Sequence, residues 1–214
     1  MVATVAFALS LLSSPQPCQA DAAAMAMVQR ALAATEQVQD YSATVAVTVA
    51  SPDVNIPRRT AKVYFKRPDK VHVESEGLMV IPRDALMLGN LGSYVEQYAT
   101  ASFIGSGTLS GRPVRAIKLS PRDPRPADGR LLVWIDSERH LLLKSEVWRA
   151  GNHMLTAKFE HTRVDQRYWM PRRIVTEMKA GALSRRAEAG RVELVFSDYR
   201  VNRGIPDSVF EGTN

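Results

Sequence analysis

The chain has 214 residues, of which 45% are apolar and 23% are charged, and its formal net charge is +6. These proportions are close to the average of globular proteins, so they exclude a disordered or fibrous chain. No apolar run approaches the roughly 20 residues that a membrane-spanning helix requires. The composition therefore predicts a globular protein with nothing spanning a membrane, and no break in composition indicates a second domain.

Residues 1–20 are typical of a secretory signal peptide. An apolar or small run, Val2–Leu12, is followed by a polar, proline-containing stretch and by Ala20, after which we expect cleavage. The segment contains no Lys or Arg, which indicates that the true start lies upstream. The alternative is an amphipathic N-terminal helix, which Pro15 and Pro17 would end early.

Cys18 is the only cysteine, so an intrachain disulfide and a cysteine-based zinc site are both excluded. A lipid-attachment cysteine requires an aliphatic residue three positions before it and a small residue just before it. Pro15 and Pro17 occupy those positions, so lipidation of Cys18 is the less favoured alternative. We expect a mature domain from Asp21 to Asn214, exported to the periplasm without a lipid anchor.

A helix is predicted for residues 21–38, where Met25, Val28 and Leu32 recur at helical spacing. Strict alternation then predicts strands at 41–49, 59–66 and 70–74, with a turn at Pro68. A sheet with one covered face buries every second residue. We therefore expect an apolar, concave ligand-binding face under the helix, lined by Val45, Val47, Val49, Val63, Phe65, Val71 and Val73.

The second half predicts five more strands, at 130–136, 140–149, 154–164, 169–179 and 191–199. Strands of this length joined by short turns form one antiparallel sheet that is long enough to curl. Residues 77–129 are interpreted as a Gly- and Pro-rich connection with a short helix at 83–91. Some second-half strands are apolar on both faces, and they add four candidate ligand-binding residues: Trp134, Leu142, Trp148 and Trp169.

Positive charge is concentrated in residues 58–70 and 163–191. On an exported protein, such patches predict contact with anionic headgroups or an acidic partner and not with nucleic acid. The alternative is a solvated sheet face whose Lys and Arg protect strand edges. The candidate partner-binding residues are Arg58, Arg59, Arg172 and Arg173.

No catalytic or metal-binding pattern is present in the sequence. The four histidines fall in predicted strands without metal-ligand spacing, and the glycine pairs lack the strand-to-helix setting of a phosphate loop. We therefore expect no enzyme activity, no metal and no cofactor.

Three stretches resemble a known group of periplasmic proteins. Tyr64–Val71 and Val195–Phe210 resemble the strand-turn-strand and the C-terminal ending of the outer-membrane lipoprotein carrier family (LolA type). Gly111–Asp123 and Leu132–Glu146 are closer to the N-terminal domain of the sigma-factor regulator RseB, which shares that fold. The resemblance implies an α+β fold in which a curled, incomplete antiparallel β-barrel has helices covering its concave face.

The resemblance also implies a function. A carrier of this kind holds lipoprotein acyl chains, phospholipid or another amphiphile for outer-membrane sorting, as a monomer that meets a membrane-bound donor or acceptor protein. The family's gating arginine aligns with no motif here, although Arg58 and Arg59 lie near the expected strand. The alternative is an RseB-like sensor that binds an anti-sigma factor or mislocalised lipoproteins. That sensor would need a further domain after Phe210, so the carrier is preferred.

Overall fold

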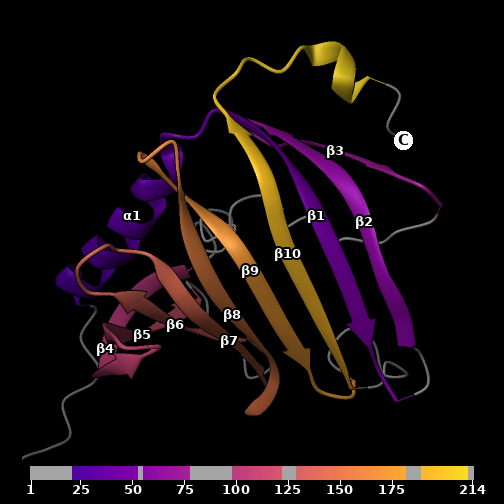
Figure 1. The fold of residues 1–214 in the computed structure, drawn as a ribbon. Coiled ribbons are helices and arrows are strands. Elements are labelled where there is room, and N and C mark those ends of the chain that lie inside the picture. The colour runs from indigo at the N-terminus through magenta and orange to yellow at the C-terminus, as the bar shows by residue number, and fades with distance from the viewer. Residues whose placement is uncertain (1–20, 53–54, 78–97, 122–128, 182–188, 212–214) are drawn as a thin grey trace, which may run out of the picture.

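The computed structural model describes residues 21–52, 55–77, 98–121, 129–181 and 189–211. Ten strands form a single antiparallel sheet in the order β3-β2-β1-β10-β9-β8-β7-β6-β5-β4. The sheet curls without closing, so β3 and β4 are its two edges (Figure 1). The strands are β1 (Asp40–Ala50), β2 (Asn55–Lys66), β3 (Lys70–Ser75), β4 (Tyr98–Leu109), β5 (Arg112–Pro121), β6 (Arg130–Asp136), β7 (Leu142–Arg149), β8 (Asn152–Val164), β9 (Tyr168–Met178) and β10 (Gly190–Val201).

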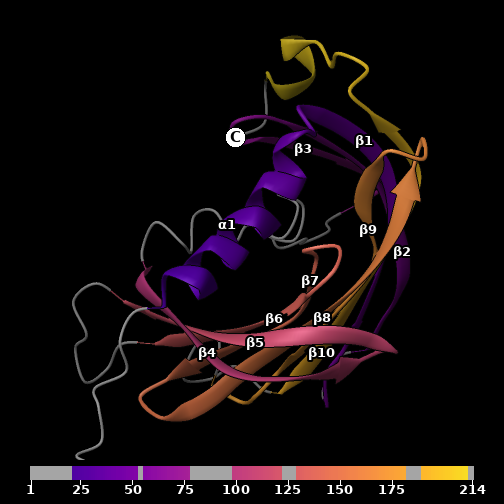
Figure 2. The same cartoon turned by 90° about the vertical axis from the view of Figure 1, so that its left-hand side faces the viewer.

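The helix α1 (Ala22–Glu36) confirms the helix predicted from the sequence. Asp21 is its N-cap, because its carboxylate accepts hydrogen bonds from the backbone N–H groups of Ala23 and Ala24. These donors have no partner within the helix, which is why Asp is favoured at this position. The backbone N–H of Asp21 donates to the carbonyl of Ala101 at 2.9 Å and ties the helix start to β4. Figure 2 shows α1 lying across the concave side of the sheet.

The strands predicted from alternation are confirmed, but the interpretation of residues 77–129 as a connection is wrong. This stretch contains the strands β4 and β5, of 12 and 10 residues. Gly105, Gly107 and Pro113 look like turn residues, yet the two glycines lie in the edge strand β4, and Pro113 lies near the start of β5, outside the part of β5 that pairs with β6. Gly and Pro are tolerated there because fewer ladder hydrogen bonds are required. The short helix expected at 83–91 and the signal peptide expected at 1–20 lie outside the described residues.

Two apolar clusters lie on the same face of the sheet. The helix cluster joins α1 to β4, β5 and β6 through buried Ala24, Met27, Val28, Ala31, Ala101, Ile117, Leu119, Leu131, Val133 and Ile135. The concave cluster joins β1, β2, β9 and β10 through buried Val38, Tyr41, Ala43, Val45, Val47, Ala61, Val63, Phe65, Met170, Ile174, Leu194, Phe196 and Val201.

The register shows that the two clusters share a face. Val133 lies opposite Ser145, which lies opposite Ala157. Two residues further along β8, Phe159 packs against the concave cluster and lies opposite Ile174. Because side chains alternate between faces along a strand, Ala157 and Phe159 point to the same side. The apolar lining is therefore continuous from the helix-covered half of the sheet to the half around β1.

Candidate functional site

The candidate site is the concave cluster, which the sequence analysis located through the alternation in its first three strands. Val45, Val47, Val63 and Phe65 are buried in it. Val49, Val71 and Val73 are partly buried and pack against it. These seven side chains therefore share one apolar face, as expected. Whether a ligand occupies that face stays a prediction.

Aromatic rings fill one end of the concave cluster. The centroid of the Tyr41 ring lies 5.4 Å from that of Phe65 and 5.7 Å from that of Tyr199, and Phe196 stacks on Tyr199 at 6.1 Å. The Tyr199 hydroxyl donates to the carbonyl of Pro171 at 2.6 Å. Burial raises the pKa of Tyr41 well above its usual value, so its hydroxyl stays neutral at every physiological pH. This end of the face is aromatic and uncharged.

The helix contacts the sheet away from the concave cluster. Its buried side chains belong to the helix cluster with β4, β5 and β6, and its start is hydrogen-bonded to Ala101. No α1 residue is a member of the concave cluster in the part of the chain that the structure describes. The sequence analysis expected the helix over Val45, Val63 and their neighbours, and its position over the other half corrects that detail.

The three tryptophans of the candidate set lie on the convex face, which corrects their assignment to the ligand-binding face. Trp134 alternates with Val133 and Ile135 of the helix cluster, so it points the opposite way. Trp169 lies between Tyr168 and Met170, which both pack in the concave cluster. Like Trp134, it packs instead against the small cluster of Val114, Leu141 and Leu143. Leu142 is the exception, because it packs against the helix cluster.

A cation covers each tryptophan on the convex face. Trp148 follows Val147, a neighbour of the helix cluster, and has the guanidinium of Arg130 4.7 Å from its ring centroid. The Lys144 ammonium lies 4.1 Å from Trp134, and the Arg139 guanidinium lies 4.7 Å from Trp169. The apolar residues on the second face of these strands are thus explained by cation–π packing at the surface. A second internal cavity is not needed to account for them.

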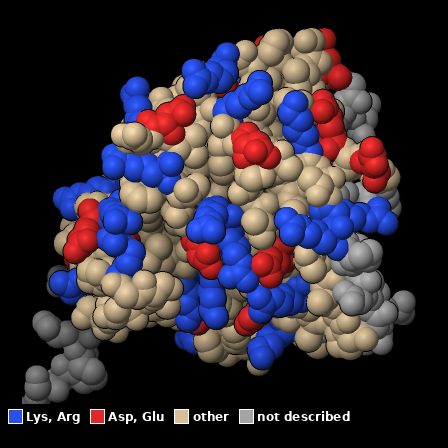
Figure 3. Space-filling view, viewed as in Figure 1, with Lys and Arg blue, Asp and Glu red and all other residues tan. Residues whose placement is uncertain are grey.

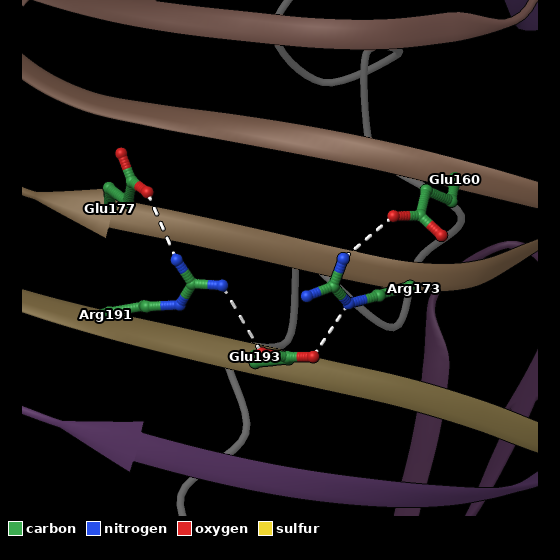
Figure 4. Close-up of polar contacts among 5 residues, drawn as sticks. All are labelled: Glu160, Arg173, Glu177, Arg191 and Glu193. Carbon is green, nitrogen blue, oxygen red and sulfur yellow. Dashed lines mark hydrogen bonds and ion pairs between the residues drawn. The ribbon is translucent and has the colours of Figure 1, made fainter. Parts of the chain in front are cut away.

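The convex face is rich in both Lys and Arg and in Asp and Glu (Figure 3). Across β8, β9 and β10, Arg173 pairs with Glu160 at 2.9 Å and with Glu193 at 2.7 Å, and Arg191 bridges Glu177 and Glu193 (Figure 4). The hydrogen bond from Arg173 holds the pKa of Glu193 below its usual value. The Arg173 guanidinium is therefore engaged within the chain, whereas its neighbour Arg172 is exposed.

Arg58 and Arg59 are both exposed and lie on opposite faces of β2. Arg59 pairs with Val47 and continues the row of Ala61 and Val63, so it stands at the rim of the concave cluster. It lies beyond Ala61, the last residue of β2 that β3 pairs with in this direction. The partner-binding role of these arginines stays a prediction.

The sequence analysis missed a polar hub that adjoins the aromatic end of the concave cluster, where Asp40 pairs with Lys66 next to Tyr41 and Phe65. The Asp40 carboxylate accepts from the backbone N–H groups of Arg203 and Gly204, and the Asn202 side chain accepts from the N–H of Gln39 at 2.7 Å. Lys66 donates to the carbonyl of Ile205 and pairs with Asp207 at 2.6 Å. The C-terminal segment and its 3₁₀ helix η1 (Asp207–Phe210) are thereby bound over the ends of β1, β2 and β3. The only sequence signal was the resemblance of this ending to the carrier family.

Within the described ranges, no group of three His, Cys, Asp or Glu side chains is placed to hold a metal ion. Among the same residues, none of the helices has the length and hydropathy to cross a bilayer.

Solved structures with the same fold share little sequence with this chain, so the likeness establishes the fold. A protein domain from Vibrio parahaemolyticus, described as outer membrane lipoprotein-sorting, is 16% identical with a TM-score of 0.65, and the match covers 88% of this chain and 96% of that one. A DUF1329 family protein from Desulfovibrio piger is 15% identical with a TM-score of 0.64, covering 88% and 97%. A LolA superfamily protein from Nitrosomonas europaea is 14% identical with a TM-score of 0.58, covering 87% and 96%.

The sequence itself gives one family match. Comparison with curated proteins gives none. A family model described as "Uncharacterized protein" matches residues 88–214, which include all of the strands from β4 to β10. The chain therefore belongs to that family, and its curled sheet with a helix on the concave side is the LolA-like fold.

Proposed function

We propose that this protein is a non-catalytic periplasmic carrier that binds the acyl chains of a lipoprotein, or of another amphiphile, on its concave cluster. The observation that carries the proposal is the composition of that face. Six strands contribute side chains to it, every member is hydrophobic, and among the described residues α1 packs elsewhere. Two of the solved structures with this fold are described as a lipoprotein-sorting domain and a LolA superfamily protein, which is consistent with such a cargo.

Binding of this kind requires no reactive group. Each methylene that leaves water for an apolar site contributes roughly 0.8 kcal/mol, so an acyl chain gains affinity in proportion to the length that it buries. The partly buried members Val49 and Val192 lie at the end of the face away from the polar hub, in the register of β1 with β10. We infer that acyl chains enter from this end, because the hub around Asp40 closes the other.

The charged arginines fit a docking role outside the acyl site. Arg172 is exposed on β9, and Arg58 and Arg59 are exposed on β2. Cations at these positions would attract anionic headgroups or an acidic membrane-bound partner in a manner that salt weakens. The domain proposed to carry these functions is residues 21–214, following export.

The test is saturable binding of a fluorescent fatty acid, followed by its displacement with a diacylated lipopeptide. Val49→Glu places a carboxylate at the entrance of the concave face and should abolish binding, because desolvating a charge against acyl chains costs several kcal/mol. Thr48→Glu is the matched control, since Thr48 neighbours Val49 on the same strand but points to the convex face. It should bind like the wild type.

Circular dichroism and the Tm of both variants would establish that each is folded. Equal binding by the two variants would show that the acyl site lies elsewhere. No saturable binding by the folded wild type would contradict the carrier proposal and leave the regulator of the sequence analysis.

A further inference from the structure

Three exposed arginines at and beside Trp169 stack on aromatic rings and have no acidic partner. The guanidinium of Arg139 lies 4.7 Å from the ring centroid of Trp169, and that of Arg163 lies 5.8 Å from the same centroid. The guanidinium of Arg167 lies 5.1 Å from the ring centroid of Tyr168. In the part of the chain that the structure describes, none of the three forms an ion pair. These three arginines and Trp169 are here called the arginine patch.

Two turns of the sheet bring the arginine patch together. Arg163 lies directly opposite Trp169 in the hairpin of β8 and β9. Strand β7 pairs with β8 no further along than Lys158, so the end of this hairpin extends past β7. Trp169 therefore reaches the turn between β6 and β7, which carries Arg139. Residues far apart in the sequence thus form one surface at the end of the convex face.

The turn that carries Arg139 is ordered by a buried carboxylate. The Asp136 side chain is fully buried, and it accepts from the backbone N–H groups of Glu138 at 2.9 Å and Arg139 at 3.0 Å. Arg112 donates to the same carboxylate and pairs with Glu138 at 2.8 Å. Asp165, in the turn between β8 and β9, pairs with an arginine outside the patch. The carboxylates of both turns are therefore engaged elsewhere and do not neutralise the arginine patch.

The chemistry of the arginine patch suits carboxylates from another molecule. The three guanidinium groups donate no hydrogen bond within the described residues, so their N–H groups can donate to a carboxylate, which accepts two at once from an arginine. An arginine stacked on a ring is already ordered, so it loses less side-chain entropy on binding. Arg, Trp and Tyr are also the residue types that dominate the binding energy of protein interfaces.

A membrane surface fits the arginine patch less well than an acidic peptide does. Proteins that lie on a membrane insert aromatic or aliphatic side chains among the headgroups. The rings of Tyr168 and Trp169 are instead partly buried and stacked against guanidinium groups. Ile104, the large hydrophobic side chain that is exposed among the described residues, lies on the edge strand β4 and not in the patch. An acidic peptide can pair with the arginines without inserting any side chain.

We propose that the arginine patch binds an acidic segment of a partner protein, whose carboxylates pair with Arg139, Arg163 and Arg167. These arginines are not among the docking residues predicted from the sequence. Trp169 lies on the convex face, on the opposite side of the sheet from the concave cluster. The segment and an acyl cargo can therefore bind at the same time, and the proposal does not depend on the proposed cargo.

Fluorescence anisotropy of a fluorescein-labelled peptide in which glutamate and glycine alternate tests the site. Wild type should bind this peptide saturably at low salt, and should not bind the peptide with lysine in place of glutamate. Arg163→Gln should raise the dissociation constant roughly fivefold or more, because a charge-assisted hydrogen bond is lost. Lys158→Gln is the matched control, since Lys158 is an exposed cation on the same strand but outside the patch. It should bind nearly as the wild type does.

Trp169→Leu separates ordered arginines from charge alone. It keeps all three cations and removes a ring on which two of them stack. The dissociation constant should rise roughly threefold, because those arginines must then be ordered on binding. Circular dichroism would establish that each variant is folded, and Arg163→Gln with Lys158→Gln decides the matter if Trp169→Leu does not fold.

Four results would overturn the proposal. The first is no saturable binding of the glutamate peptide by the folded wild type. The second is equal weakening by Arg163→Gln and Lys158→Gln, which would mean unspecific attraction to a basic protein. The third is wild-type affinity in a folded Trp169→Leu variant. The fourth is binding to phosphatidylglycerol vesicles without binding to the peptide, which would assign the arginine patch to a membrane.

Discussion

Arg67 donates a hydrogen bond from its guanidinium to the carbonyl of Thr35 at 2.9 Å, and so joins the turn after β2 to the last turn of α1. The same side chain donates to the carbonyl of Val38 at 2.9 Å, while its backbone N–H bonds to Gln39. The last carbonyls of a helix have no partner within it, and a cation is favourable at that end of the helix dipole. The turn that contains Arg67 and Pro68 thus fixes where the helix ends relative to β2.

Replacement of Arg67 by Met should lower the free energy of unfolding by about 2 kcal/mol, because two partly buried carbonyls lose a charged donor. Urea denaturation followed by circular dichroism would measure the change. Arg67→Lys keeps the charge but cannot reach both carbonyls, so it should fall between Met and the wild type. Equal stability of all three proteins would show that the helix end does not depend on this side chain.

His161 should make the protein less stable in mild acid. Burial lowers the pKa of His161 from 6.5 to about 4, and its Nδ1 has no hydrogen-bond partner among the described residues. Above pH 6.5 the imidazole is neutral in the folded and in the unfolded protein, so the free energy of unfolding does not depend on pH through this group. Between pH 6.5 and pH 4 the unfolded state binds a proton that the folded state does not, so stability falls by up to about 3 kcal/mol. In His161→Phe this part of the pH dependence should be absent from the unfolding curves.

Reversing the charge at Arg173 should destabilise the fold, whereas reversing the charge at Arg172 should not. Arg173→Glu places a third carboxylate between Glu160 and Glu193 and removes both ion pairs. Arg172→Glu changes an exposed side chain. Thermal unfolding should give a lower Tm for Arg173→Glu alone, and high salt should narrow the difference. Arg172→Glu is therefore the variant to use in assays of membrane or partner docking.

Substitution of Trp148 should leave acyl binding unchanged. Trp148 lies on the convex face, where its ring is covered by Arg130 and its indole N–H donates to Glu146 at 3.1 Å. Trp148→Ala removes those contacts without reaching the concave cluster. The fluorescent fatty-acid assay should give the wild-type dissociation constant, and a large loss of affinity would mean that the convex face contributes to the site.

The sequence could predict the face of the sheet for those residues whose strand shows its own alternation of apolar and polar positions. Period-two alternation located Val45, Val63 and Phe65 on one buried face, because a strand with one covered side leaves that signal in any sequence. Apolar character alone could not assign Trp134 or Trp169 to a face. Their strands are apolar on both sides, and the cation that stacks on each ring lies in another element: Lys144 in β7 for Trp134, and Arg139 in the turn before β7 for Trp169.

The polar hub and strand β4 were missed for different reasons. Asp40, Asn202 and Gly204 meet only after the two ends of the domain come together, so no spacing in the sequence predicts their hydrogen bonds. The glycines of β4 are turn residues in most contexts, and only the position of the strand at an edge makes them compatible with a sheet.

The pairing of β1 with β10 sets the order in which this protein can fold. From β4 to β10 each strand pairs with its neighbour in the chain, so this meander needs only short loops to close. Val45 of β1, by contrast, lies opposite Phe196 of β10. Strands β1, β2 and β3 join the rest of the sheet only through β10, so they cannot pair with it until β10 is in place. The loop closed by that pairing is nearly as long as the domain. Assembly of the face around β1 is therefore a late, slow step, during which its valines and aromatic rings are open to water and to aggregation.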